Sequence, residues 1–300
     1  MKMIGVTPKG EFLLSPPVSA KLVMEEAAPA DGFTGVFPLM QGMGKLCSIR
    51  IYDQKQRLCF DGIVDEQKEI CGAGRTLTVT ARSRAALLLD NEAIPQTYCM
   101  PSLETIFARH IQPYGFSGFR GENKNFQGEL TITKGMSEWQ AAERFCTQFL
   151  QKKPRISGTV FDVSEKIPCG EMLFDNAGGT PYSSISTDYR ACDRLSEILA
   201  KPEKGGAYST AARDEEAIRL GIRRRRCLAE GATSADEKIR AAKRKSFRIV
   251  VDCPGGISAQ IFQHATVRDA VLGSFSDVYI AGIEYRLDAN GESTRYVLRR

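Results

Sequence analysis

The segment that most constrains the fold is 75–93, because its hydrophobic period changes from two residues to helical spacing within a few positions. In its first half Leu77, Val79 and Ala81 alternate with threonines, which places them on one face of a strand. From Arg82 onward the apolar residues recur at helical spacing. The sequence therefore predicts a strand that runs almost directly into a short helix and joins two layers of the fold.

Candidate catalytic residues are few in this chain. Ser83 precedes the predicted helix but lacks the Gly-x-Ser-x-Gly frame of a nucleophile elbow, so we interpret it as a helix cap. His110 and His264 lie in apolar surroundings and are interpreted as packed residues rather than general bases. The glycine pairs at 178–179 and 255–256 lack a phosphate-binding context. The sequence predicts no catalytic, cofactor-binding or metal site.

Length and composition are those of a globular protein. The 300 residues are 42% hydrophobic and 26% charged, which suggests two or three domains with a sizeable core. No apolar run approaches the ~20 residues that span a membrane. The first residues lack a long apolar stretch with a small-residue cleavage site, so we expect synthesis in a cytosol.

Nine cysteines are spread through the sequence without a Cys-x-x-Cys pair. Their odd number and wide spacing favour reduced, mostly buried thiols over disulfides or a zinc site.

Residues 1–92 have the pattern of a β-rich block. Strands are expected over 18–24, 46–53, 57–66 and 76–81, and a loop is expected over 27–38. Successive antiparallel strands with polar turns suit a barrel or a sandwich.

Residues 93–157 change to a mixed pattern. A helix over 101–112 has Ser102 as its cap and Pro113 as its end, and a second helix is expected over 137–151. Short strands near 116–120 and 130–133 complete an α+β insert.

Residues 158–300 return to strands. They are expected over 158–163, 171–175, 182–188, 247–251, 279–287 and 294–298, with short helices over 188–199 and 234–245 and a loop over 201–208. A basic helical insertion occupies about 212–246. The predicted fold class is α+β, mainly β, with two β-barrel domains and an α+β insert between them.

Positive charge is concentrated at 219–248, where eleven Lys and Arg face only Glu230, Asp236 and Glu237, although the whole chain carries +5. This excess fits an acidic protein partner, nucleic acid, or a solvated helix over 234–245. Aromatic residues do not interleave with the basic ones, as a single-strand binding platform requires. The candidate partner-binding residues are Arg223, Arg224, Arg225, Arg226, Lys238, Arg240, Lys243, Arg244 and Lys245.

Several motifs together resemble one family. They are FDGIVDE at 60–66, LTVTARSRAALLLDNEA at 77–93, PSLETIF at 101–107, QPYGF at 112–116, SSIS at 183–186, GIRRRRC at 221–227, RIVVDCPG at 248–255 and YRLDANGESTRYVL at 285–298. In this order they resemble the hub proteins of contractile phage tails and prophage particles, of the PBSX type and the late control D family.

The resemblance implies a structural baseplate hub without cofactors. Three subunits, each with two tube-like β-barrels, would form a pseudo-sixfold ring between a sixfold tail tube and a threefold spike. Its partners would be itself as a homotrimer, the tail tube protein, the spike protein and other baseplate proteins, in the host cytoplasm and then in the particle. The alternative is an enzyme carried by such a particle that acts on peptidoglycan or nucleic acid.

Overall fold

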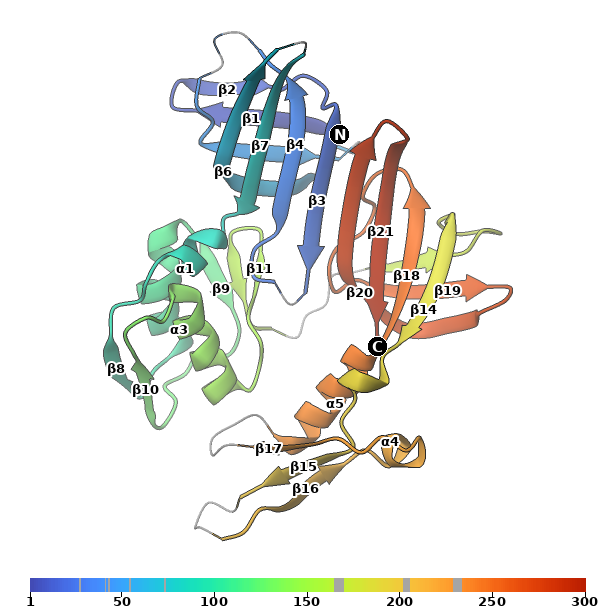
Figure 1. Ribbon diagram of the computed structural model, residues 1–300. Helices are drawn as coiled ribbons and strands as arrows, with labels where there is room; N and C mark the ends of the chain where they lie inside the picture. The colour runs from blue at the N-terminus through green and yellow to red at the C-terminus, as the bar shows by residue number, and fades with distance from the viewer. Residues whose placement is uncertain are drawn as a thin grey trace.

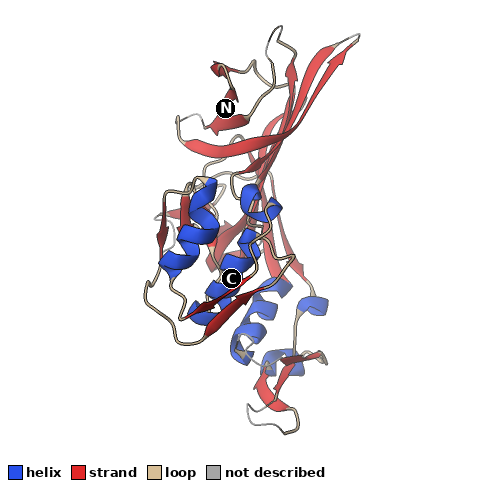
Figure 2. Cartoon of the chain, turned by 90° about the vertical axis from the view of Figure 1, so that its left-hand side faces the viewer, coloured by secondary structure: helices blue, strands red, loops and turns tan. Residues whose placement is uncertain are grey.

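The computed structural model describes residues 1–26, 28–40, 42, 44–53, 55–72, 74–164, 170–201, 206–228 and 234–300. The fold is mainly β, and most strand pairs are antiparallel. Strands form two blocks, at the top and right of Figure 1, and the helices lie below and beside them. Figure 2 shows the helices gathered in one half of the molecule, away from the long strands of the first block.

The N-terminal block contains the strands from residue 2 to residue 83. They are β1 (Lys2–Thr7), β2 (Gly10–Leu13), β3 (Ser19–Glu25), β4 (Gly32–Pro38), β5 (Ser48–Tyr52), β6 (Leu58–Cys71) and β7 (Arg75–Ser83). The strand predictions over 18–24, 46–53, 57–66 and 76–81 are confirmed. The hairpin β1–β2 was not predicted, and the predicted loop at 27–38 is wrong because Phe33 and Phe37 point into the core from β4.

The C-terminal block contains six strands of the described chain. They are β13 (Glu171–Phe174), β14 (Ser184–Tyr189), β18 (Phe247–Pro254), β19 (His264–Asp269), β20 (Gly273–Asp288) and β21 (Gly291–Arg299). The predictions of strands over 171–175, 182–188, 247–251, 279–287 and 294–298 are confirmed.

The two blocks are continuous in hydrogen bonding. In the described part of the chain they form one 13-stranded sheet, in the order β14-β18-β21-β20-β3-β4-β7-β6-β5-β1-β2. In addition, β19 pairs with β20, and β13 pairs with β19. The junction is the antiparallel pair β20–β3, red beside blue in Figure 1, in which Gly282 pairs with Glu25 and Leu287 with Ala20. Within the described residues neither of the two predicted β-barrels closes by itself.

Each block nevertheless repeats the same strand order. Four strands lie side by side, β3-β4-β7-β6 in the first block and β14-β18-β21-β20 in the second. The fourth strand is long in both blocks and continues into a second layer, β5-β1-β2 or β19-β13. A register shift follows Val64 in β6 and Ile280 in β20, so even the irregularity recurs at the same place.

One hydrophobic cluster extends through both blocks. Close packing depends on glycines that face the core. A Cβ on Gly62 would lie 2.4 Å from the Phe60 ring and 2.6 Å from the Arg82 carbonyl oxygen, and a Cβ on Gly35 would meet the rings of Phe33 and Phe37 at 2.7 and 2.8 Å. The aromatic rings therefore lie directly over bare backbone.

The α+β insert has its own hydrophobic cluster. Its elements are α1 (Ala86–Asp90), β8 (Gln96–Cys99), α2 (Leu103–Ile106), the π-helix η1 (Phe107–Ile111), the 3-10 helix η2 (Gln112–Tyr114), β9 (Gly118–Arg120), β10 (Glu129–Ile132), α3 (Glu138–Phe145), the π-helix η3 (Cys146–Leu150), β11 (Arg155–Ser157) and β12 (Val160–Asp162). Both predicted helices are confirmed, and the Ser102 Oγ accepts the Thr105 N–H as expected of a cap. The predicted end at Pro113 is wrong, because Pro113 lies within the first turn of η2 and the helical run ends at Gly115, which has a positive φ of 87°.

The strand predicted over 158–163 belongs with the insert rather than with the second block. β12 pairs in parallel with β9, and Phe161 and Val163 are part of the insert's hydrophobic cluster.

Ser83 is not a helix cap. It ends β7, its Oγ accepts the Asp31 N–H at 3.0 Å, and the helix begins only at Ala86 without a side-chain cap. The prediction failed because β7 extends two residues beyond its alternating pattern to pair with β4 and β6.

The cysteines also differ from expectation. Eight of them lie in the described residues as free thiols, but only Cys146 and Cys253 are buried, and Cys169 lies outside the described residues. The prediction of mostly buried thiols is wrong. Burial raises the pKa of Cys253 to about 12.

Candidate interaction surface

The basic segment forms part of a small subdomain between β14 and β18. Its elements are the 3-10 helix η4 (Ala191–Asp193), β15 (Glu197–Ala200), β16 (Ser209–Arg213), α4 (Glu215–Arg219), β17 (Arg225–Leu228) and α5 (Ala235–Ser246). The helix predicted over 188–199 is wrong, since this stretch holds the end of β14, one 3-10 turn and β15. The helix predicted over 234–245 is confirmed as α5.

Apolar packing in this subdomain is slight. Its buried cluster consists of Ile198, Ala212 and Ile239, where α5 crosses β15 and β16. A cluster of this size contributes little free energy of unfolding, because hydrophobic stabilisation scales with buried apolar area. Polar contacts must therefore supply much of the order.

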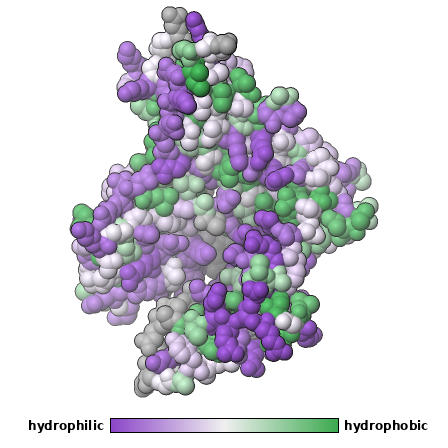
Figure 3. Space-filling model, viewed as in Figure 1, coloured by the Kyte–Doolittle hydropathy of each residue, from purple (hydrophilic) through white to green (hydrophobic). Residues whose placement is uncertain are grey.

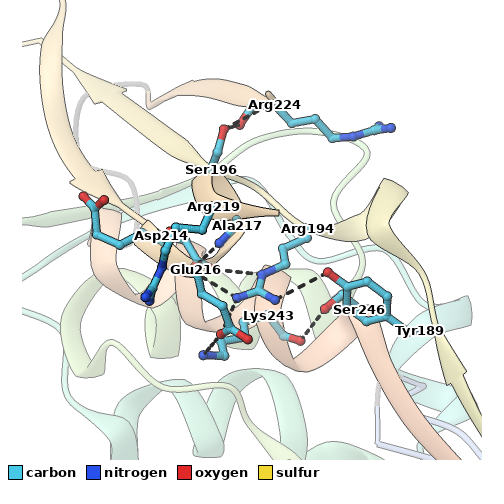
Figure 4. A network of polar contacts seen from close by, with 11 residues as sticks. Tyr189, Arg194, Ser196, Asp214, Glu216, Ala217, Arg219, Arg224, Lys243 and Ser246 are labelled. Atoms are coloured by element: carbon cyan, nitrogen blue, oxygen red, sulfur yellow. Dashed lines mark hydrogen bonds and ion pairs between the residues drawn. The ribbon is translucent and has the colours of Figure 1, made fainter. Parts of the chain in front are cut away.

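Arg194 is the centre of those contacts (Figure 4). Its side chain is only 3% exposed and makes two hydrogen bonds to the Asp214 carboxylate, at 2.8 and 3.1 Å. It also donates to Glu216 at 2.7 Å, and the Lys243 amino group reaches the same Glu216 oxygen at 2.8 Å. The network thus connects α5 to α4 and to the segment between η4 and β15, in which Arg194 lies.

The electrostatics of the network favour its charged form. Burial alone would raise the pKa of Asp214, but the hydrogen bonds from Arg194 and the Ala217 N–H, together with the charges of Arg194 and Lys243, outweigh it and lower that pKa. Hydrogen bonds from Arg194 and Lys243 lower the pKa of Glu216 to about 2. At neutral pH all four side chains are therefore charged and paired.

The charges of α5 follow the helix dipole. The Ser234 Oγ accepts the Glu237 N–H at 3.2 Å as an N-terminal cap, and Asp236 and Glu237 occupy the first turn. The last turn carries Lys243, Arg244 and Lys245, where positive charge is stabilised. These three basic residues of the segment therefore stabilise α5 itself.

Most of the nine candidate residues have acidic or carbonyl partners within the chain. The ion pairs are Arg225–Glu197 (3.4 Å), Arg240–Glu237 (3.2 Å), Lys243–Glu216 (2.8 Å), Arg244–Glu237 (2.6 Å) and Lys245–Asp193 (3.2 Å), and Arg224 donates to the Cys192 carbonyl oxygen at 3.3 Å. Among the described residues, Arg223, Arg226 and Lys238 have no side-chain partner. Glu230, counted in the sequence balance, lies outside them.

Three of the acidic partners, Asp193, Glu197 and Glu216, come from 193–216, directly before the basic segment, and Glu237 lies within the segment itself. Folding therefore neutralises part of the local excess of charge seen in the sequence. What remains is three exposed cations without a partner in the described chain, Arg223, Arg226 and Lys238, which we call the small positive surface, on a subdomain whose visible face is mostly hydrophilic in Figure 3.

The two histidines differ in their surroundings. His110 is 2% exposed, with its Nδ1 2.5 Å from Glu138 Oε2 and its Nε2 2.9 Å from the Tyr98 hydroxyl, whereas His264 is exposed at the start of β19. The His110–Glu138 pair was not predicted, because its members are far apart in sequence and meet only where η1 packs on α3. No metal-binding cluster is found among the described residues.

Comparison with known proteins shows what this fold is. The structure aligns with the tail protein of Neisseria meningitidis MC58 at a TM-score of 0.79 and 15% identity, covering 99% of this chain and 96% of that one. It aligns with the 43 kDa tail protein of prophage MuSo2 from Shewanella oneidensis at 0.77 and 16%, covering 100% and 98%. The chain has the fold of a phage tail protein.

A third neighbour extends this fold beyond phages. The Escherichia coli c3393 protein, a component of the type VI secretion system, aligns at a TM-score of 0.55 and 7% identity, over 94% of this chain and 73% of that one. No protein-family model and no curated protein matches the sequence. The suspected resemblance to tail proteins is thus confirmed by structure, at the level of the fold.

No helix in the described part of the chain is long and apolar enough to cross a membrane.

Proposed function

We propose that this protein is the structural baseplate hub of a contractile phage tail or tail-like particle. Three copies would close into a ring whose six blocks match the sixfold tail tube, while the threefold symmetry of the ring matches a spike. The observation that carries this proposal is the repeated strand order of the two blocks, β3-β4-β7-β6 and β14-β18-β21-β20. A trimer of chains with two equivalent blocks presents both symmetries.

The absence of a closed barrel within the described residues is compatible with this proposal. One merged sheet without superposable barrels would argue against a pseudo-sixfold ring. Support for the ring comes from four strands of each block, which follow the same order and share the position of a register shift, whereas the second layers differ, with β1–β5 antiparallel and β13–β19 parallel. The blocks are open at the two ends of the sheet, so the tube-like wall would be completed only by neighbouring subunits.

One face of the eight strands β14 to β6 suits the wall of a channel. Opposite the hydrophobic cluster, Asp252, Arg295 and Glu284 lie side by side on β18, β21 and β20, with Arg295 and Asp252 2.7 Å apart. Thr34 and Thr80 continue the same polar face on β4 and β7. Alternating charges and hydroxyl groups leave this face polar without a strong net charge, which limits adhesion of a passing polymer.

Partners and location follow from the same proposal. The hub would contact itself, the tail tube protein, the spike protein and further baseplate proteins, first in the bacterial cytoplasm and then in the particle. The insert and the small subdomain project from the sheet in Figure 1 and would lie outside the ring. The enzymatic alternative gains no site from the described residues.

The ring predicts a monomer–trimer equilibrium. Sedimentation equilibrium of the purified chain up to about 300 µM should fit monomer and trimer, and closed rings should appear in negative stain. A stable dimer, a chain that stays monomeric throughout, or hydrolysis of peptidoglycan by the pure protein would contradict the hub.

The small positive surface is proposed to dock an acidic baseplate partner. Replacing Arg224 and Arg225 with serine should lower the melting temperature by only a few degrees, since exposed ion pairs contribute about 0 to 1 kcal/mol each. Replacing Arg223 and Arg226 with serine should change the melting temperature equally little, but it should reduce particle assembly in a complementation assay. Unfolding of either variant would assign these arginines to the fold, and a shift of random DNA by wild type at about 150 mM salt would favour nucleic acid.

A further inference from the structure

The two ends of the long sheet are strand edges without a partner in this chain. At one end, β6 pairs with β5 as far as Ile63, so its distal half from Glu66 to Cys71 has β7 on one side and no described strand on the other, where only the Gln67 side chain bonds to the backbone of Gly44 and Leu46. At the other end, β14 pairs only with β18 among the described strands. The unpaired backbone N–H and C=O groups of such an edge can pair with a strand of another chain.

The internal repeat shows which strand each edge would take. β6 in the first block corresponds to β20 in the second, and β14 corresponds to β3. Within the chain, β20 of one block pairs with β3 of the other. The equivalent pair, β6 with β14, cannot form within one chain because these strands lie at opposite ends of the sheet (Figure 1).

We propose that β6 of one copy pairs antiparallel with β14 of a second copy, in the register that β20–β3 already shows. This inference rests on the proposed ring and specifies the contact that closes it.

The register follows from the strand pairs within the chain. Glu66 in β6 and Gly282 in β20 are equivalent, because each is the first paired residue after the register shift of its strand. Glu66 is aligned with Lys21 on β3 through the paired residues Thr80 and Thr34. Gly282 is aligned with Ser186 on β14 through Val297 and Val250. Lys21 and Ser186 are therefore equivalent. Since Gly282 pairs with a residue four positions after Lys21, Glu66 should pair with the residue four positions after Ser186, which is Arg190.

This register places opposite charges face to face. Glu66 lies opposite Arg190, and Lys68 lies opposite Asp188, on the same face of the sheet. Within the described chain neither Glu66 nor Lys68 has a side-chain partner, whereas Asp188 and Arg190 are held in place by Arg248 at 2.9 Å and by Asp193 at 3.2 Å. Opposite charges directly across two strands are stabilising and like charges are destabilising.

The other face of the same edge supplies a fit in shape. A hollow of about 420 Å³ beside β6 is lined by Lys45, Leu46, Val64, Asp65, Gln67 and Glu69. The register brings Tyr189 opposite Gln67; this tyrosine is 48% exposed in the single chain, and its hydroxyl accepts a hydrogen bond from Arg194 at 3.4 Å. An aromatic side chain from the second copy would fill the hollow and bury its own apolar ring.

The first test is a disulfide between copies. In a background in which Cys169 and the six described cysteines that are not buried are replaced with serine, Lys68→Cys with Asp188→Cys should oxidise to a covalent trimer on a non-reducing gel, and mass mapping should find the 68–188 linkage. The matched control pairs Lys68→Cys with Ser184→Cys, which lies on the same face but four residues out of register, and should not cross-link through these positions. Cα atoms more than about 7 Å apart cannot form a disulfide.

The second test is a charge exchange. Lys68→Glu places two carboxylates together, and because a ring contains the contact three times, the trimer association constant should fall about tenfold or more. Adding Asp188→Lys to Lys68→Glu should restore most of the association. Lys134→Glu, an equal charge change on the exposed surface of the insert, should have no effect.

The outcomes separate the contact from the ring. A wild-type trimer without the 68–188 linkage and without recovery in the double variant overturns this contact and leaves the hub standing. A wild-type chain that is monomeric at all concentrations overturns both.

Discussion

Replacing Arg194 with methionine should unfold the small subdomain while the large sheet stays folded. The side chain is 3% exposed, and its removal leaves the Asp214 carboxylate, 7% exposed, buried without a counter-charge. Breaking a buried pair in this way costs about 3 to 5 kcal/mol. The cluster of Ile198, Ala212 and Ile239 is too small to offset such a loss. Hydrogen exchange across 195–246 should accelerate strongly, and limited proteolysis should cut there first.

Two companion variants test the reason for this effect. Arg213→Met removes a cation that is 55% exposed and paired with Glu197 at 3.3 Å, and should change stability by about 0 to 1 kcal/mol. Arg194→Met combined with Asp214→Asn should lose less than Arg194→Met alone, because asparagine keeps the helix cap and removes the buried charge. Wild-type protease resistance in Arg194→Met would show that the network does not hold the subdomain.

Gly62→Ala should destabilise the N-terminal block by about 3 kcal/mol, a large effect for one methyl group. The new Cβ would lie 2.4 Å from the Phe60 ring and 2.6 Å from the backbone oxygen of Arg82. The ring could move only by leaving the core, where Phe60 is 3% exposed, and the β7 backbone is fixed by its strand pairs. Thermal or urea unfolding measures the loss.

The control for Gly62 lies in the same hairpin. Gly72 follows β6, and a Cβ there would meet nothing within 4 Å. Gly72→Ala should therefore unfold at nearly the wild-type temperature. Equal melting of the two variants would mean that the sheet tolerates the methyl group at Gly62.

Local pattern in the sequence was sufficient for many elements. The alternation around Leu77 and Val79 predicted β7, and the apolar stripe that begins at Trp139 predicted α3. Capping chemistry was equally readable at Ser102, because a cap involves only residues three positions apart. Where the pattern was weak, as at 188–199, a helical period was read from residues that instead form a turn and a strand.

The candidate surface shows the corresponding limit for function. The sequence determined how many cations lie in 219–248, but not that Asp193, Glu197 and Glu216 neutralise several of them. Ion pairing depends on distances between atoms of different elements, which the order of residues does not specify. Of the nine candidate cations, only Arg223, Arg226 and Lys238 have no side-chain partner within the described chain.

The sequence by itself determined many of the strands, two capped helices and the resemblance to tail hubs, because each depends on neighbours within a few residues. Only the tertiary structure decided that the two blocks share one sheet through β3 and β20, and that their strand orders match. Strand pairing joins residues more than 250 positions apart, and its register is set by packing of both faces at once. That pairing left the distal half of β6 and the outer side of β14 as the free edges.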